Sequence, residues 1–296
     1  MEHVQMHEIE IAVIGGSGLY EMEGLENIEE LRLNSPYGEP SDVITSGTLD
    51  GTKIAFLPRH GRGHFLTPSE VPYRANIFVL KQLGVRYIIA VSACGSLRED
   101  FEPGHIVIPD QLIDFTKGKR DMTFFGRGLV AHVGVAEPFS PELSEVLSNA
   151  VTEGGGIAHD GASFITIEGP RFSTRGESQM FRRWGMDLVG MTTSPEAYLA
   201  AEAEIAYACM AHVTDYDVWH ETEEAVTAEM VIQILAGNLE IAQRAIGNLA
   251  RTKEKWEGDF AAHRAMEGAL ALVSDWGRVP SDVQEQLSPL IGRYIS

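Results

Sequence analysis

Short apolar runs alternate with amphipathic stretches of helical length over the first two-thirds of the chain. Continuous apolar runs bounded by turn residues are typical of buried strands, whereas apolar positions three and four residues apart are typical of helices. One segment, residues 46–57, is divided by the favoured two-residue turn Asp50-Gly51 and is predicted to form a hairpin. Further strands are predicted over residues 8–14, 86–91, 105–115, 163–167, 188–191 and 205–213.

Helices are predicted between these strands from their start and stop signals. Ser140 followed by Pro141 is typical of a helix N-terminus, and Thr174 with Glu177 forms a capping-box pattern. A second capping box is expected at Ser281. Helices are therefore predicted over residues 72–83, 174–183, 227–250 and 259–276, and from residues 140, 194 and 281 onwards.

Strands and helices alternate first and helices alone follow, which predicts an α/β fold. We expect a single three-layer domain with a helical C-terminal tail. The domain is predicted to cover residues 1–251. Residues 252–296 are expected to form an extension that packs on the same domain or on a neighbouring subunit.

The composition excludes several classes of function. The chain carries 43 acidic and 23 basic residues, a net charge of −20, which disfavours nucleic-acid partners. No run reaches the roughly 18 apolar residues that span a bilayer, and residues 1–10 lack the apolar core of a signal peptide, so we expect a cytoplasmic protein without membrane association. Cys94 and Cys209 lie in apolar stretches and are expected to be buried, reduced thiols. No Cys/His ligand spacing indicates a metal site.

Two segments could bind an anion. The turn Gly16-Ser17-Gly18 follows the first predicted strand and exposes backbone N–H groups, although an ordinary tight turn is an equal alternative. It is no dinucleotide fingerprint, because Glu21 stands where the third glycine is needed. Residues 58–64 (PRHGRGH) are the densest cationic run, and arginine binds phosphate in a bidentate manner; the alternative is a solvated loop.

Three more strand ends carry small, aromatic or hydroxyl side chains. Residues 92–96 are small and leave room for a ligand. Phe172 could stack on a planar ligand beside the neutral donor Ser173, and Met191 offers a soft apolar surface beside Thr192. Helix caps and core packing explain each of these separately, so the prediction of a site depends on their combination.

The pair Asp215 and Asp217 follows a predicted buried strand, residues 205–213. Two carboxylates two residues apart project from the same side of an extended segment. Such a pair can transfer a proton, accept hydrogen bonds from a ligand N–H group, or bind a metal ion. The metal alternative lacks a third ligand at a suitable spacing.

Six motifs in order resemble the 5′-methylthioadenosine phosphorylases of the trimeric purine nucleoside phosphorylase family. The resemblance covers residues 8–249 and is carried by GGSGLY, PRHGRGH, VSACGSL, GPRFSTR, GMTTSPEA and TDYDVW. It implies a nucleoside phosphorylase-like fold with a central mixed sheet. It also implies a nucleoside substrate, inorganic phosphate as co-substrate and no cofactor. The expected assembly is a homotrimer, and the association of two trimers into a hexamer is left open.

The resemblance also assigns site residues. Phosphate is expected at Ser17, Arg59, His60, Ser92, Ala93 and Thr192. The nucleoside is expected at Phe172, Ser173 and Met191, with His132 lent by a neighbouring subunit and Ala228 and Val231 near the 5′ group. Leu287 and Leu290 of the tail are candidates for the neighbour's site.

The hydrogen-bonding groups at the base favour adenine. By this resemblance, relatives that cleave inosine and guanosine have Glu and Asn at two positions that read the base. This chain has Ser173 and Asp215 at those positions. The donor and acceptor pattern is thereby inverted, which suits a 6-aminopurine. The expected reaction is phosphorolysis of 5′-methylthioadenosine to adenine and 5-methylthioribose 1-phosphate. Asp215 is expected to protonate adenine N7, and Asp217 is expected to adjust the pKa of Asp215.

Three alternatives remain. The chain could be a broader 5′-deoxyadenosine or adenosine phosphorylase, a hydrolytic nucleosidase, or a non-catalytic nucleoside-binding protein.

Overall fold

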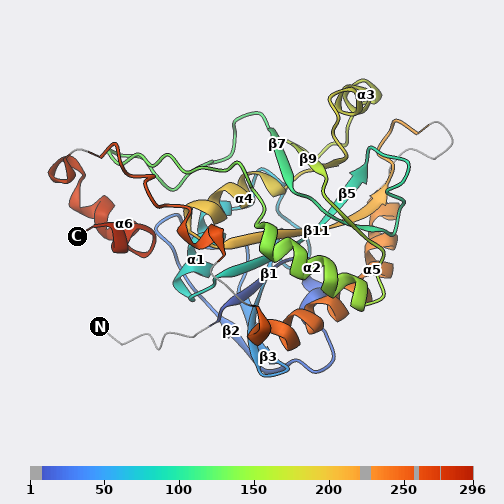
Figure 1. Ribbon diagram of the computed structural model, residues 1–296, viewed down its shortest axis with the longest axis horizontal. Coiled ribbons are helices and arrows are strands. Elements are labelled where there is room, and N and C mark those ends of the chain that lie inside the picture. Colours follow the sequence, from blue (N-terminus) through green and yellow to red (C-terminus); the bar gives the residue numbers. More distant parts are fainter. Residues whose placement is uncertain (1–8, 221–227, 257–259, 274, 296) are drawn as a thin grey trace.

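A mixed β-sheet forms the centre of the molecule in the computed structural model, which describes residues 9–220, 228–256, 260–273 and 275–295 (Figure 1). Its order along the main path is β2-β3-β4-β1-β5-β10-β9-β7, while β11 pairs with β5 and β6, and β8 pairs with β6. The strands are β1 (Ile11–Gly15), β2 (Glu26–Leu31), β3 (Ile44–Leu49), β4 (Thr52–Pro58), β5 (Tyr87–Ser96), β6 (Ile106–Ile108), β7 (Gln111–Phe115), β8 (Ala158–Asp160), β9 (Ser163–Ile167), β10 (Leu188–Gly190) and β11 (Ala206–Asp215).

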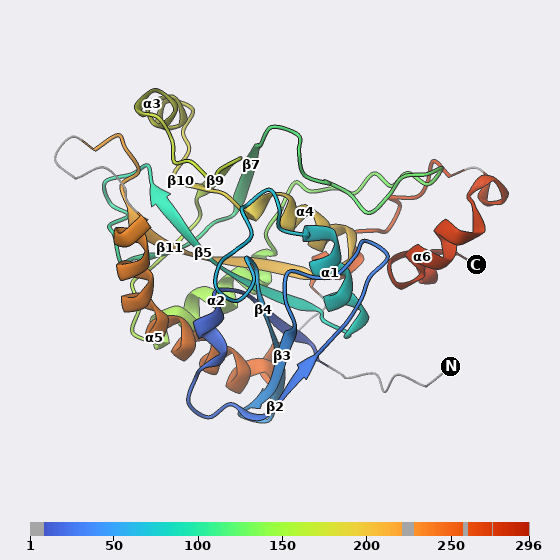
Figure 2. The ribbon, with the colours of Figure 1, turned by 180° about the vertical axis from the view of Figure 1, so that it is seen from behind.

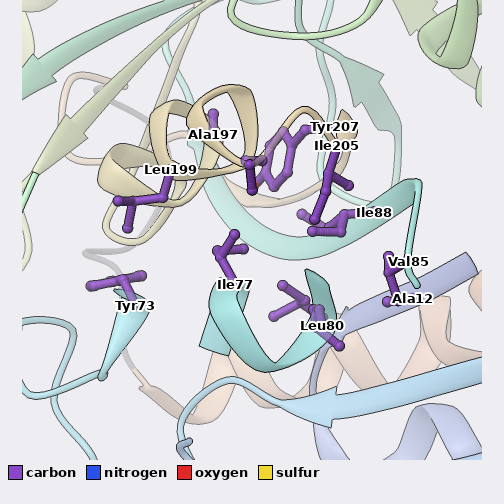
Figure 3. Close-up of a cluster of buried hydrophobic side chains, with 14 of the residues drawn as sticks. Ala12, Tyr73, Ile77, Leu80, Val85, Ile88, Ala197, Leu199, Ile205 and Tyr207 are labelled. Carbon is purple, nitrogen blue, oxygen red and sulfur yellow. The ribbon is translucent and has the colours of Figure 1, made fainter. Parts of the chain in front are cut away.

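Helices cover both faces of the sheet, which explains why the central strands are apolar without alternation. One core cluster joins the sheet to α1 and α4, and the other joins it to α2 and α5. Figure 3 shows part of the first of these clusters, to which Ile77 of α1, Leu199 of α4 and Ile88 of β5 contribute. The helices are α1 (Tyr73–Gln82), α2 (Pro141–Glu153), α3 (Arg175–Arg183), α4 (Thr193–Glu202), α5 (Ala228–Thr252) and α6 (Ser281–Ile291). The predicted three-layer α/β architecture with a mixed sheet is therefore confirmed.

Several local predictions are confirmed by the backbone. Asp50 and Gly51 both have positive φ, at 48° and 81°, as a tight hairpin turn requires. Thr174 and Glu177 form the predicted capping box of α3. None of the described helices has both the length and the apolar character to cross a membrane.

The prediction of a helix over residues 259–276 is wrong for the described residues. Only a short 3-10 turn, Ala261–Arg264, and the first residue of another, Trp276–Arg278, form there. Tertiary partners occupy the backbone instead: Met266 N–H donates to Glu204, and the Ala269 carbonyl accepts from His132 N–H. The helix from Ser281 exists, but Pro280 is its N-cap and no side chain caps it, so the predicted capping box is wrong.

The C-terminal tail packs against an extended segment, residues 116–139, that leaves the sheet after β7. The two run side by side towards α6 (Figures 1 and 2). Leu287 and Leu290 of α6 are buried in the same core cluster as Phe124 and Leu129 of this segment. Both leucines are therefore core residues of their own chain, which contradicts their candidacy for a neighbour's site.

Candidate active site

The predicted anion-binding segments emerge together from adjacent parallel strands. Gly15 at the end of β1 pairs with Pro58 at the end of β4, and Arg59 N–H donates to the Gly15 carbonyl at 3.0 Å. The Gly-rich turn is also held by α5, because Gln243 Nε2 donates to the Gly18 carbonyl at 3.0 Å. The side chain of Ser17 lies outside the part of the chain that is described.

Arg59 is buried, and its guanidinium donates hydrogen bonds to groups of the same chain. Its Nε and Nη2 donate to the two carboxylate oxygens of Glu196 at 2.7 and 2.8 Å. Its remaining bonds go to the carbonyls of Val91 at 3.0 Å and Ile14 at 3.3 Å. Since a guanidinium has five N–H groups, these four bonds leave one Nη1 proton for a ligand.

The charge of Arg59 is stabilised by Glu196. Burial disfavours the charged guanidinium, but the Glu196 carboxylate outweighs it and holds the pKa of Arg59 above its usual range. Glu196 also accepts a hydrogen bond from the Tyr207 hydroxyl at 2.8 Å. Because Arg59 is neutralised in this way, an anion here must be bound largely by neutral donors.

His60 presents a neutral ring to this region. Its Nδ1 lies 2.8 Å from the Leu66 carbonyl, which can only accept, so Nδ1 carries the hydrogen. Burial, followed by the positive charge of Arg59, lowers the pKa of His60 to about 4. The ring stacks on His64 with centroids 4.3 Å apart.

Two hydroxyl groups from distant parts of the chain meet beside Arg59. Ser92 Oγ of β5 and Thr192 Oγ1 lie 3.2 Å apart, both buried. They meet because β10 runs antiparallel to β5, so the residues after β10 return alongside the middle of β5. Thr192 is the N-cap of α4, yet its side chain makes no capping bond, which leaves its hydroxyl directed to Ser92. Ala93, the neighbour of Ser92, is half-buried.

The two acids lie together, but not on one extended segment as predicted. Strand β11 ends at Asp215, and Asp217 has a φ of +51°. Asp217 N–H donates to Asp215 Oδ1 at 2.7 Å, which is an Asx turn. Thr214 Oγ1 donates to Asp215 Oδ2 at 2.6 Å. A turn, and not strand alternation, thus brings the carboxylates together.

Both acids are buried, at 8% and 7% exposure, and both have raised pKa values. Burial raises the pKa of Asp215 to about 6, against the opposing bonds from Thr214 and Asp217 N–H. Burial also raises the pKa of Asp217, partly offset by the nearby hydroxyls of Ser178 and Ser173. No hydrogen bond of ordinary geometry joins these hydroxyls to Asp217, and Asp217 Oδ2 and both Oγ atoms are buried without a partner among the described residues.

The loop after β9 faces the acids. Ser173 is buried, whereas Phe172 is 38% exposed and available to stack on a planar ligand. Met191 is half-buried against this loop, since a Cβ on Gly169 would lie 2.6 Å from its Sδ. The predicted base and ribose residues are thus brought together.

The predicted residues for the 5′ group are not brought together on this chain. His132 is exposed and lies beside the tail, where its N–H donates to the Ala269 carbonyl at 2.9 Å. Val231 is half-buried on α5, and the side chain of Ala228 falls outside the described residues.

Three buried residues of this site were missed by the sequence interpretation. They are Glu196, Ser178 and Arg120, none of which was singled out as a site residue. The distances that reveal their roles join residues far apart in the chain, for example 137 positions between Arg59 and Glu196. Among the described residues, no group of three or more His, Cys, Asp and Glu side chains is arranged to bind a metal ion.

Comparisons with known proteins show the family of this chain. The profile of the phosphorylase superfamily matches residues 10–251. The S-methyl-5′-thioadenosine phosphorylase of Chloroflexus aurantiacus is 53% identical over 292 residues, covering 98% of this chain and 100% of that protein. The protein of the same name from Geobacter sulfurreducens is 48% identical over 285 residues, covering 96% and 99%.

Solved structures are similar over the same length. A methylthioadenosine phosphorylase from an antarctic soil metagenomic library has a TM-score of 0.91 and 48% identity, covering 96% of this chain and 99% of that one. The methylthioadenosine phosphorylase of Schistosoma mansoni, solved in complex with adenine, has a TM-score of 0.77 and 32% identity, covering 96% and 98%. The resemblance inferred from six motifs is confirmed: this chain belongs to the phosphorylase superfamily and, within it, to the family of S-methyl-5′-thioadenosine phosphorylases.

Proposed function

We propose that this chain is a pentosyltransferase that cleaves 5′-methylthioadenosine with inorganic phosphate, giving adenine and 5-methylthioribose 1-phosphate. The observation that carries the proposal is the combination of a buried acid with a raised pKa, Asp215, with a set of anion donors around Arg59 at one edge of the sheet. The names of relatives that are 48–53% identical over nearly the whole chain support the same reaction.

The phosphate subsite is assigned to the free Nη1 proton of Arg59, the hydroxyls of Ser92 and Thr192, the Ala93 amide and the Gly-rich turn with Ser17. His60 lines this subsite as a neutral ring. Mostly neutral donors suit a protein of net charge −20, because they bind an anion through fixed dipoles without needing excess positive charge.

The reaction follows from this placement. A phosphate oxygen forms a bond to C1′ of the ribose while the bond from C1′ to N9 of the purine breaks, and the bonding electrons pass into the base. Asp215 donates its proton to N7, so adenine leaves as a neutral molecule and Asp215 is left as a carboxylate. Its raised pKa of about 6 keeps a useful fraction protonated near neutral pH.

The acceptor pattern of the base site favours adenine. Asp217 Oδ2 is buried without a partner and can accept from the N6 amino group, while Ser173 provides a neutral hydroxyl. A 6-oxopurine would present an acceptor to Asp217, and each buried mismatch costs about 1–3 kcal/mol. Methionine salvage and adenine salvage are the processes that such a reaction serves.

The enzyme is proposed to act as a homotrimer in the cytoplasm. His132 lies on the segment 116–139, which also exposes Val130, and the adjacent tail exposes Leu272. Exposed apolar residues beside a histidine far from its own site suit a subunit contact that delivers this histidine to the neighbour. The free, buried thiols of Cys94 and Cys209 suit a reducing compartment. Sedimentation as three subunits supports the trimer, and a monomer at assay concentration contradicts it.

A substrate panel tests the proposed specificity. Methylthioadenosine, 5′-deoxyadenosine, adenosine, methylthioinosine and inosine are compared by kcat/KM at saturating phosphate. We expect both inosine derivatives to react at least about tenfold more slowly than their adenosine counterparts, as one buried mismatch implies. Equal rates for methylthioinosine and methylthioadenosine would refute the assigned roles of Ser173 and Asp217.

A further inference from the structure

Arg120 is a buried arginine whose hydrogen bonds connect two loops of the site. Its side chain has no exposed surface. Its Nη1 donates to the carbonyls of Met191 and Ser194, both at 2.7 Å. Its Nη2 donates to the carbonyl of Glu168 at 2.8 Å. One guanidinium therefore fixes the backbone after β10 and the backbone after β9 relative to each other.

These two loops carry different halves of the proposed site. The loop after β9 continues from Glu168 to Phe172 and Ser173, which are assigned to the base. The loop after β10 holds Met191 and Thr192, assigned to ribose and phosphate. No sheet hydrogen bond can fix the two loops to each other, because β9 and β10 end before them.

A supporting cluster holds Arg120 in place. Its Nε lies 4.0 Å from Glu168 Oε1, and that oxygen also accepts a hydrogen bond from Ser69. Glu168 Oε2 accepts from Lys117 N–H at 2.5 Å. The Arg120 guanidinium also lies 5.5 Å from the ring centroid of Tyr73. The guanidinium is thus enclosed on several sides.

The hydrogen-bond partners of Arg120 differ from those expected of a buried residue that only stabilises the fold. Most of its partners are neutral carbonyls, and its one carboxylate neighbour is at the limit of an ion pair. Burying a guanidinium without a close counter-charge costs free energy, which its hydrogen bonds to the carbonyls must offset. An arginine fork, however, can hold carbonyls from two loops in one plane, which neither lysine nor an apolar residue can do.

We propose that Arg120 is a positioning residue that sets the spacing between the base subsite and the ribose–phosphate subsite. The inference depends on the proposed function and concerns the same site. A reaction of two bound substrates is sensitive to displacements of about 1 Å, so loosening this connection weakens the binding of both substrates and slows the chemical step.

The test compares Arg120→Lys and Arg120→Gln with the control Arg74→Lys. Arg74 bonds to Asp121, the neighbour of Arg120, but in a partly exposed ion pair outside the site. We measure kcat and KM for methylthioadenosine and for phosphate, the calorimetric Kd of adenine and of phosphate, and the melting temperature. In the Arg120 variants we expect kcat to fall and both KM values and both Kd values to rise, each by about tenfold or more, and we expect all of them to stay unchanged in the control.

A lowered melting temperature with unchanged Kd and KM values would overturn the inference, since Arg120 would then serve the scaffold alone. A rise confined to one substrate would overturn it as well. Failure of both Arg120 variants to fold, with the control folded, would likewise assign Arg120 to the scaffold. The proposed function fails separately, if the unmodified enzyme releases no adenine; the Kd values for adenine and phosphate still decide the role of Arg120 in that case.

Discussion

Gly95 of β5 lies so close to Asp215 that a Cβ on Gly95 would stand 2.9 Å from Asp215 Oδ1. The same Cβ would stand 3.2 Å from the Cβ of Asp217. The absence of a side chain on β5 is therefore what allows the two acids to lie against this strand, where the proposed proton transfer takes place.

Gly95→Ala is expected to displace the Asp215 carboxylate from its bonds with Thr214 and Asp217. We predict that kcat for methylthioadenosine falls by about 100-fold or more, because a misplaced general acid loses most of its effect. The KM for phosphate should change little, since Ser92 lies three residues earlier on β5 and Thr192 lies at the N-terminus of α4. Gly247→Ala in α5 is the control, because its added Cβ has no atom within 4 Å. Full activity of Gly95→Ala would contradict the placement of the acids.

The ion pair between Arg59 and Glu196 predicts how phosphate changes the melting temperature when Glu196 is replaced. Glu196→Gln leaves the buried charge of Arg59 without compensation and should lower stability by about 3–5 kcal/mol. A bound phosphate supplies the missing negative charge, so it should raise the melting temperature of the variant more than that of the unmodified protein. Thermal unfolding with and without phosphate measures this difference. An equal or smaller gain in the variant would show that phosphate does not bind beside Arg59.

The raised pKa of Asp215 predicts the pH dependence of the reaction. A general acid must be protonated, so kcat/KM should fall as the pH rises above about 6, the value to which burial raises this pKa. Asp215→Asn cannot donate the proton, and we expect it to reduce kcat by about 100-fold or more and to remove this part of the pH profile. If Asp215→Asn retains full phosphorolysis with an unchanged profile, Asp217 or another group is the acid.

His212 predicts a pH-dependent stability. It is buried in β11 with both ring nitrogens unpartnered among the described residues, and burial lowers its pKa to about 4 from 6.5. Below pH 6.5 the unfolded chain gains a proton that the folded chain does not, so stability is full above pH 6.5 and is lost as the pH falls towards 4.

Replacing His212 by methionine, of similar size, should reduce the loss of unfolding free energy between pH 7 and pH 5 by about 1–2 kcal/mol. Denaturant unfolding at the two pH values measures the effect. The same loss in His212→Met and in the unmodified protein would mean that other groups cause the acid sensitivity.

The sequence predicted the parts of the molecule that depend on local pattern. Continuous apolar runs located β9 and β11 because both faces of the sheet are covered by helices. The edge strand β2 was missed because its residues, ENIEEL, are almost all exposed and carry no apolar signal. The helix expected over 259–276 failed because tertiary hydrogen bonds replace helical ones at Met266 and Ala269.

The site was predictable only as far as its residues stand in recognisable motifs. Arg59, Ser92, Thr192 and Asp215 were found in this way, whereas Glu196 and Arg120 depend on contacts across the fold. The turn at Asp217 was also out of reach, because a positive φ at an aspartate is set by its hydrogen bond to Asp215.

The central claim is that the bond between ribose and adenine is broken by phosphate. The most direct measurement incubates the unmodified protein with 5′-methylthioadenosine, with and without phosphate, and identifies the products by chromatography and mass. We predict adenine and 5-methylthioribose 1-phosphate in equal amounts, and only when phosphate is present. Adenine with free methylthioribose at the same rate without phosphate would contradict the claim and identify a hydrolase, and no adenine under either condition would contradict it altogether.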